Sequence, residues 1–129
     1  MTITGVCYVA LSVSDVERSV RFYTEVLGFS ELHRVSDDGR RAIAVRSADG
    51  SVGLGLVELA ASARDKFTPL RTGLDHLCLL VPAKEDLEAW SARLSDFGVE
   101  HSGVLPTPFG PILNFKDPDG IALAFKAGA

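Results

Sequence analysis

The chain has 129 residues, enough for one compact domain or for two small halves that share a core. Hydrophobic residues make up 47% and charged residues 23%, a balance that excludes a disordered chain, and no apolar run approaches the roughly 20 residues of a membrane-spanning helix. The net charge of −4, without a basic cluster, argues against a nucleic-acid partner, and the N-terminus lacks signal-peptide features, so we expect a cytoplasmic protein.

The first half of the chain predicts a strand, a helix and three more strands. Residues 6–13 alternate between an apolar face and a second face that includes Tyr8. Ser14 and Glu17 form a capping-box pattern that is expected to begin the helix, and Gly28 is placed to end it. The apolar stripe of this helix consists of Val16, Val20, Tyr23 and Leu27. Shorter strands are expected near residues 31–35, 41–47 and 52–59.

The second half repeats this order. Its first strand places Leu77, Leu79 and Val81 on one face and His76, Cys78 and Leu80 on the other. The helix that follows carries the stripe Leu87, Trp90, Leu94 and Phe97 and ends at Gly98. Three strands are then expected near residues 101–105, 112–116 and 121–126, with Asp-Gly pairs in the turns.

The two halves are an internal repeat. The segment that starts at Ile43 matches the segment that starts at Leu113, with an offset of 70 that also aligns Gly28 with Gly98. We therefore predict an α+β fold in a single domain, residues 1–129, built from two βαβββ modules, residues 1–63 and 73–129. Each module is expected to form a small curved mixed sheet with a helix on one face, and the other faces would enclose a shared cleft.

Two cysteines, Cys7 and Cys78, lie inside apolar strand-like runs. Two such thiols in a cytosolic chain are more often buried packing residues than a disulfide, so we expect them to be part of the core.

Three segments carry a resemblance to a known family. The run YVALSVSDVERSVRFYTEVLGF at residues 8–29, the run GLDHL at 73–77 and the run FKDPDGI at 115–121 resemble, in order, the signatures of the vicinal-oxygen-chelate superfamily. This superfamily includes glyoxalases, bleomycin-resistance proteins and extradiol dioxygenases. The resemblance covers nearly the whole chain, and it implies the glyoxalase/bleomycin-resistance/dihydroxybiphenyl-dioxygenase-like fold, often as a homodimer.

The resemblance also identifies four positions that hold a divalent metal in other members. Three of these positions correspond to Tyr8, His76 and Ala124. The fourth corresponds to a residue of the fourth strand of the first module. The offset of 70 gives Leu54 for this last position, a one-residue slip gives Gly55, and a different register gives Glu58. A Lewis acid needs several N or O ligands, and only His76 matches the family, so we expect no resident metal or other cofactor, with a divalent metal left open.

Four residues are predicted to bind a small-molecule ligand. Tyr8 and His76 occupy corresponding places in the two modules and are expected to face each other across the cleft. Asn114 alternates with apolar neighbours, so its side chain either points into the cleft or lies on the surface, and Phe109 belongs to a stiff loop at residues 106–111 that would form the rim of the pocket.

The function implied by the resemblance is a metal-free small-molecule binding protein of the bleomycin-resistance type, with an aromatic or amphipathic ligand. One alternative is a metal-dependent lyase, isomerase or dioxygenase with a non-standard site. Another is a structural or regulatory dimer without a ligand. The sequence contains no nucleotide-binding or serine-hydrolase motif, and it leaves open whether the chain is an enzyme.

Overall fold

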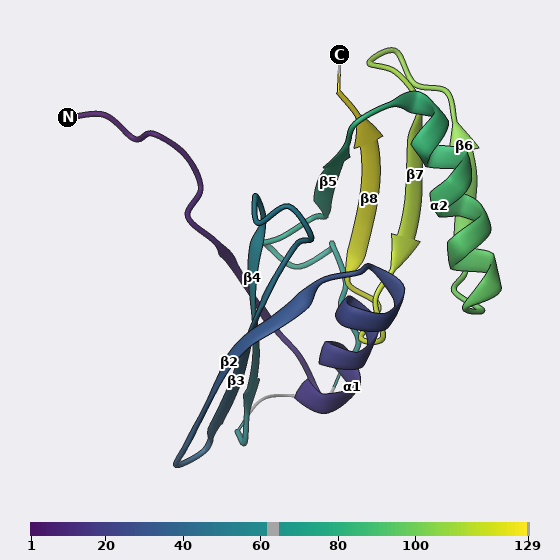
Figure 1. Ribbon diagram of the computed structural model, residues 1–129. Coiled ribbons are helices and arrows are strands. Elements are labelled where there is room, and N and C mark those ends of the chain that lie inside the picture. The colour runs from purple at the N-terminus through teal and green to yellow at the C-terminus, as the bar shows by residue number, and fades with distance from the viewer. Residues whose placement is uncertain (62–64, 129) are drawn as a thin grey trace. The chain divides into compact units, whose positions relative to one another are not determined.

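The computed structural model describes residues 1–61 and 65–128, which form two compact units, Met1–Asp65 and Lys66–Ala129. Each unit has one strand, a helical segment and three more strands, in that order (Figure 1). This order confirms the predicted α+β fold of two βαβββ modules. Within the described residues, no helix has the length and apolar character required to cross a membrane.

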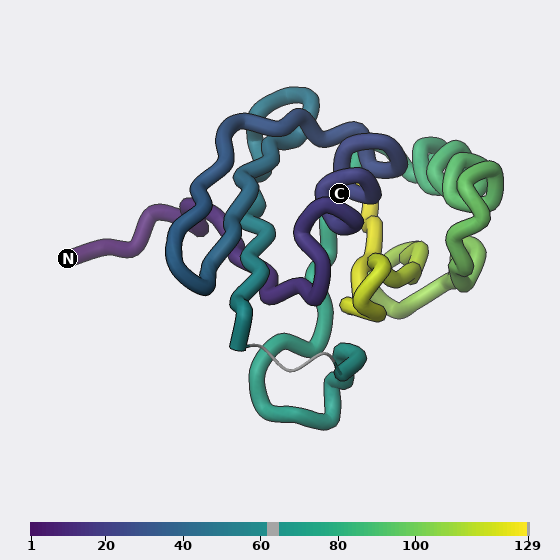
Figure 2. Tube along the Cα trace, turned by 90° about the horizontal axis from the view of Figure 1, so that it is seen from below, coloured from purple at the N-terminus to yellow at the C-terminus, as the bar shows by residue number. Residues whose placement is uncertain are grey.

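The first unit contains a four-stranded sheet with the strand order β1-β4-β3-β2. Its elements are β1 (Val9–Ser12), α1 (Val16–Arg21), the π-helical turn η1 (Phe22–Val26), β2 (Ser30–Asp37), β3 (Arg40–Arg46) and β4 (Gly53–Leu59). Strand β1 pairs with β4 in parallel, and the other pairs are antiparallel. The first strand is shorter than predicted, because residues 1–8 extend away from the rest of the unit (Figure 2).

The second unit repeats this topology, with the strand order β5-β8-β7-β6. Its elements are β5 (Leu77–Val81), α2 (Lys84–Asp96), β6 (His101–Leu105), β7 (Ile112–Lys116) and β8 (Ala122–Ala127). Strand β5 pairs with β8 in parallel, and β7 pairs with both β8 and β6 antiparallel. Helix α2 lies along one face of this sheet (Figure 1). The opposite face carries no helix of its own unit.

Helix α1 begins one residue later than the capping-box pattern predicts. Asp15 is the N-cap, and its carboxylate accepts a hydrogen bond from the backbone amide of Arg18 at 3.1 Å. The Ser14 hydroxyl instead accepts a hydrogen bond from the Arg18 guanidinium. The predicted box of Ser14 and Glu17 is therefore wrong, because the amide of the first turn at Val16 is satisfied by a strand residue far away in the sequence, Glu58.

Apolar stripes on the helices form the cores, as predicted, with one exception. In the first unit the buried stripe is Val16, Val20, Tyr23 and Leu27. In the second, Leu87 and Leu94 are buried and Trp90 stacks on Phe125 with ring centroids 4.6 Å apart. Phe97 is half exposed, so its predicted core position is wrong. It caps the end of α2, where the Arg93 guanidinium lies over its ring.

Both cysteines are exposed free thiols. The prediction that they are buried packing residues is wrong for a different reason in each unit. Cys7 lies in the extended segment before β1. Cys78 lies on the side of β5 opposite α2, because its neighbour Leu79 is buried on the other side of the strand. An apolar run predicts a strand, but it does not by itself predict which face another element covers.

Candidate functional site

The helix-free face of each sheet is the side that its own helix does not cover. In the first unit it carries Tyr8, Ala10 and Ser12 of the first strand region, because the alternate residues Leu11 and Val13 are buried. Tyr8 comes directly before β1 and is 64% exposed. Its phenol is therefore accessible from the helix-free side of this unit.

The position that corresponds to Ala124 in the first unit is Gly55. In the turn after β3, the Ser47 amide donates a hydrogen bond to the Val52 carbonyl. In the equivalent turn after β7, the Asp117 amide donates to the Ile121 carbonyl. The first turn is one residue longer. The offset of 70 that relates the modules therefore becomes 69 beyond the turn.

The strand register leads to the same correspondence. Ala10 pairs with Gly55 in β1 and β4, and Cys78 pairs with Ala124 in β5 and β8. Gly55 lies on the helix-free face, and a Cβ built there would meet only the side chain of Ala10 at 3.5 Å and its Cα at 3.7 Å, which are ordinary contacts. Leu54, given by the simple offset, is 2% exposed and lies on the opposite face, in the core.

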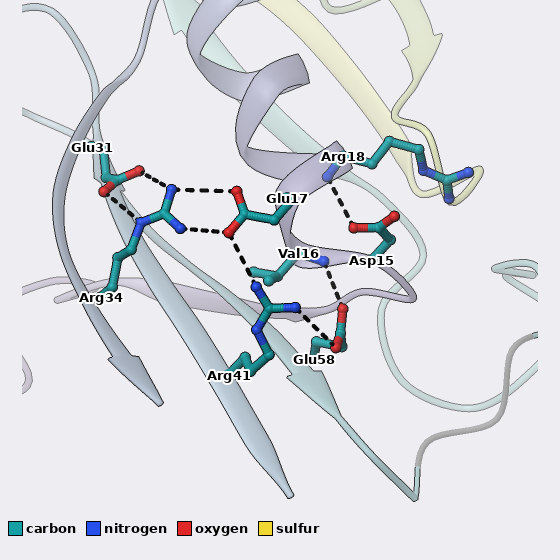
Figure 3. Close-up of polar contacts among 8 residues, drawn as sticks. All are labelled: Asp15, Val16, Glu17, Arg18, Glu31, Arg34, Arg41 and Glu58. Atoms are coloured by element: carbon teal, nitrogen blue, oxygen red, sulfur yellow. Dashed lines mark hydrogen bonds and ion pairs between the residues drawn. The ribbon is translucent and has the colours of Figure 1, made fainter. Parts of the chain in front are cut away.

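Glu58 also points to the helix side of the first sheet. Its Oε1 accepts a hydrogen bond from the Val16 amide at 2.9 Å, and its Oε2 lies 3.8 Å from the Arg41 guanidinium (Figure 3). Arg41 also contacts Glu17, which forms an ion pair with Arg34. This carboxylate therefore fixes the start of α1 to the sheet and does not face the side on which Tyr8 and Gly55 lie.

His76 directly precedes β5 and is exposed on the helix-free face of the second unit. Its Nδ1 lies 2.7 Å from the Asp75 carboxylate, which selects the tautomer with the proton on Nδ1 in the neutral ring. Nε2 then remains available to accept a hydrogen bond from a ligand, or to donate one when the ring is protonated.

Asn114 and Cys78 flank Ala124 on the same face. Ala124 pairs with Cys78 on one side and with Asn114 on the other, so the three residues form one row across β5, β8 and β7. Asn114 and Cys78 are exposed, and Ala124 between them is a short residue without any group that could bind a metal. Partial burial raises the pKa of the Cys78 thiol, and a nearby positive charge on Lys126 opposes this only in part.

Phe109 lies in the turn between β6 and β7, and 84% of its surface is exposed. The turn is organised by Thr107, whose hydroxyl accepts a hydrogen bond from the Phe109 amide and donates one to the Gly110 carbonyl. The Lys126 ammonium donates to the Phe109 carbonyl. Lys126 shares the helix-free side of β8 with Ala124, so this bond attaches the turn to the end of that face.

These residues do not fit the metal site of the family. The four corresponding positions are Tyr8, Gly55, His76 and Ala124, and two of them have no side-chain donor at all. A neutral phenol is a weak metal ligand. Within residues 1–61 and 65–128, no group of three or more His, Cys, Asp or Glu side chains is placed to hold a metal ion. One imidazole does not provide the several N or O ligands of a persistent site.

Two lysines of the second sheet were not predicted as site residues. Lys116 and Lys126 lie two residues beyond Asn114 and Ala124 in their strands, and therefore on the same face. The alternation of the sequence was a sufficient signal, because residues 114 and 116 must share a side once Leu113 and Phe115 are assigned to the core.

The chain is similar to known proteins over almost its full length. Residues 5–125 match the family described as the Glyoxalase/Bleomycin resistance protein/Dioxygenase superfamily. Catechol-2,3-dioxygenase of Bacillus subtilis (strain 168) is 32% identical over 124 residues, which are 96% of this chain and 41% of that protein. The chain thus spans about two fifths of the length of this curated relative.

Two solved structures have the same fold. The glyoxylase/bleomycin resistance protein/dioxygenase domain from Frankia sp. EAN1pec is 35% identical with a TM-score of 0.92, and the match covers 99% of this chain and 94% of that one. TnmS3, an antibiotic binding protein from Streptomyces sp. CB03234, is 29% identical with a TM-score of 0.75, covering 100% and 99% of the two chains. The chain belongs to the glyoxalase/bleomycin resistance protein/dioxygenase superfamily.

Proposed function

We propose that the chain is a small-molecule binding protein that holds its ligand on the helix-free face of a sheet without a resident metal. The observation that carries this proposal is the identity of the residues at the four positions that bind a metal in other family members. Gly55 and Ala124 have no donor atom, Tyr8 has a weak one, and His76 stands alone. A Lewis acid that is to polarise a substrate must be fixed by several ligands, and these residues do not supply them.

The chemistry of the second sheet supports binding. His76 Nε2 and the Asn114 amide are directional hydrogen-bonding groups on an exposed surface, and Leu80 on the same face is 76% exposed. A few placed polar groups among apolar ones are typical of a site that orients a small organic ligand. The similarity to an antibiotic binding protein, TnmS3, is consistent with this type of function.

A ligand screen tests the proposal. Aromatic and amphipathic compounds that bind the folded state must raise the melting temperature. We expect at least one such compound to do so, and we expect His76→Ala to reduce its shift while the unliganded melting temperature stays near that of the parent. A hit whose affinity is the same in His76→Ala would remove this histidine from the site. If no compound in a broad aromatic library shifts the melting temperature, the binding proposal fails.

The second candidate function is a ring-cleaving dioxygenase activity. The similarity to catechol-2,3-dioxygenase favours it, although this chain spans only 41% of that protein. Incubation with catechol and iron(II) under air distinguishes the two functions, because ring cleavage produces a coloured product. The binding proposal predicts no turnover, and turnover that His76→Ala abolishes would favour the enzyme.

A further inference from the structure

We infer that the second sheet binds an amphipathic molecule with one anionic group, and that Lys116 is the residue that selects the charge. This inference rests on the proposed function and specifies the chemical class of its ligand. It is carried by the arrangement of the helix-free face of the second sheet, where the strand register places an exposed lysine with polar side chains at one end and mainly apolar side chains at the other.

The polar end is formed by His76, Asn114 and Lys116. Lys116 pairs with Ala122 in β8, and Asn114 pairs with Ala124. His76 precedes Leu77, whose partner is Leu123, so it lies on the other side of β8 at the level of Ala122. The two alanines have short side chains, Ala124 is fully buried, and longer polar side chains lie on both sides of them.

Lys116 places one exposed positive charge at this end. Lys116 is exposed, and within the described residues no carboxylate forms an ion pair with it. The Asp75 carboxylate lies at the same end, 2.7 Å from His76 Nδ1. An ammonium group and an amide N–H can both donate to one carboxylate, sulfonate or phosphate, and charge-assisted bonds of this kind are stronger than neutral ones.

The apolar end is formed by Leu80, Ile112 and Leu105. Leu80 pairs with Lys126, Lys126 pairs with Ile112, and Ile112 pairs with Leu105, so all lie in one row across the sheet. Leu80 and Leu105 are large exposed hydrophobic residues, as is Phe109 in the adjoining turn. This row also contains Lys126, whose ammonium donates a hydrogen bond to the Phe109 carbonyl.

The two ends are separated by a distance that fits a small organic molecule. Lys116 lies four residues after Ile112 in β7, and at about 3.3 Å per residue this corresponds to about 13 Å along the strand. A fused aromatic ring system with an acidic substituent, or a medium-length acyl chain with a terminal acid, has an extent of this order. The anion would lie near Lys116 and the hydrocarbon near Leu80.

A matched pair of dyes tests the inference on the full chain. 8-Anilinonaphthalene-1-sulfonate and N-phenyl-1-naphthylamine share one aromatic skeleton, and only the first carries an anion. Fluorescence titration of the native protein is expected to show tighter binding of the sulfonate. Lys116→Gln is expected to weaken the sulfonate about tenfold, as the loss of one charge-assisted hydrogen bond requires, and to change the neutral dye by less than about twofold.

Lys84→Gln is the matched control, because it removes the same charge from the exposed first turn of α2 and should leave both dyes unchanged. The near-ultraviolet circular dichroism of Trp90 verifies that each variant is folded. Displacement of the sulfonate by decanoate and by decyl phosphate distinguishes a carboxylate from a phosphate ligand. Decyltrimethylammonium, with the same chain and the opposite charge, should not displace it.

Each outcome has a distinct meaning. Equal affinities for the two dyes with no effect of Lys116→Gln, or displacement by the cation as effective as by the acids, would overturn the anionic ligand class and leave the proposed binding function standing. Failure of both dyes to bind the native protein would overturn both proposals. Selective loss of the sulfonate in Lys116→Gln, but not in Lys84→Gln, would support them.

Discussion

The carboxylate of Glu58 on β4 accepts a hydrogen bond from the backbone amide of Val16 at 2.9 Å, across 42 residues of sequence. Val16 is the first residue of α1, and the backbone amides of a first helical turn have no acceptor within the helix. A strand side chain thus performs the capping that a local residue usually provides. The relationship explains why a glutamate that lies close in sequence to the second metal position of the family is a structural residue in this chain.

Replacement of Glu58 tests this role. We expect Glu58→Ala to lower the free energy of unfolding by about 1–2 kcal/mol, because the part-buried Val16 amide loses its acceptor. Glu58→Gln keeps an oxygen at the same place and should be less destabilising. Urea denaturation measures both variants. Equal losses in the two would show that the ion pair with Arg41, rather than the hydrogen bond, provides the stabilisation.

Asp15 should contribute stability that depends on pH. The Arg18 amide bonded to its carboxylate lowers the pKa of Asp15 below the ordinary value of 3.8. Because the folded pKa is below the unfolded one, this contribution is complete above about pH 4 and is lost as the pH falls through the folded pKa. Asp15→Ala should cost about 1 kcal/mol at neutral pH.

Asp15→Asn is the control, because asparagine caps a helix as well as aspartate but does not titrate. Urea denaturation at pH 7 and near pH 3 should show that the parent loses stability relative to Asp15→Asn on acidification. A constant difference between these two proteins over that range would contradict the assignment of Asp15 as a titrating N-cap.

The Cys78 thiol should be a poor nucleophile at neutral pH. Its partial burial raises its pKa above the ordinary value of 9.0, and the thiolate is the reactive form. In a Cys7→Ser background, we expect the rate of alkylation by iodoacetamide to keep rising with pH through 9 and to have its midpoint above that value. A midpoint below 9 would indicate an activated thiol.

Ser19 offers a test of the core of the first unit. Its side chain is fully buried, and among the described residues its hydroxyl has no hydrogen-bond partner. By contrast, the Thr24 hydroxyl donates a hydrogen bond to the Val20 carbonyl at 2.7 Å. Removal of a buried hydroxyl without a partner avoids its desolvation cost, so Ser19→Ala should leave the free energy of unfolding unchanged or raise it by up to about 1 kcal/mol. Thermal denaturation with Thr24→Val as the comparison measures the sign. A clear loss of stability in Ser19→Ala would show that the hydroxyl has a partner.

The repeat and its alternating strands made most of the fold predictable from the sequence. Local periodicity identifies which residues of β5 and β7 are buried, and this assigns Leu79 and Leu113 to the core and His76 and Asn114 to the other face. The start of α1 was not predictable in the same way. Its first amide is satisfied by Glu58, a contact that depends on the pairing of β1 with β4.

The second family position illustrates the same limit. A constant offset predicts Leu54, but one additional residue in the turn after Ser47 shifts the correspondence to Gly55 and so exchanges the two faces of the strand. The additional residue is difficult to recognise in the sequence, because both turns contain an Asp-Gly pair that aligns without a gap. The hydrogen bonds that close each turn reveal it.

Measurement of the metal content tests whether Tyr8, Gly55, His76 and Ala124 hold a catalytic ion. Inductively coupled plasma mass spectrometry of protein purified without chelators, and again after incubation with iron(II), manganese(II), nickel(II) or zinc(II) and desalting, measures it. We predict far less than one equivalent of any metal, with the same value in His76→Ala. One equivalent of a divalent metal in the parent, lost in His76→Ala, would show that these positions do hold an ion.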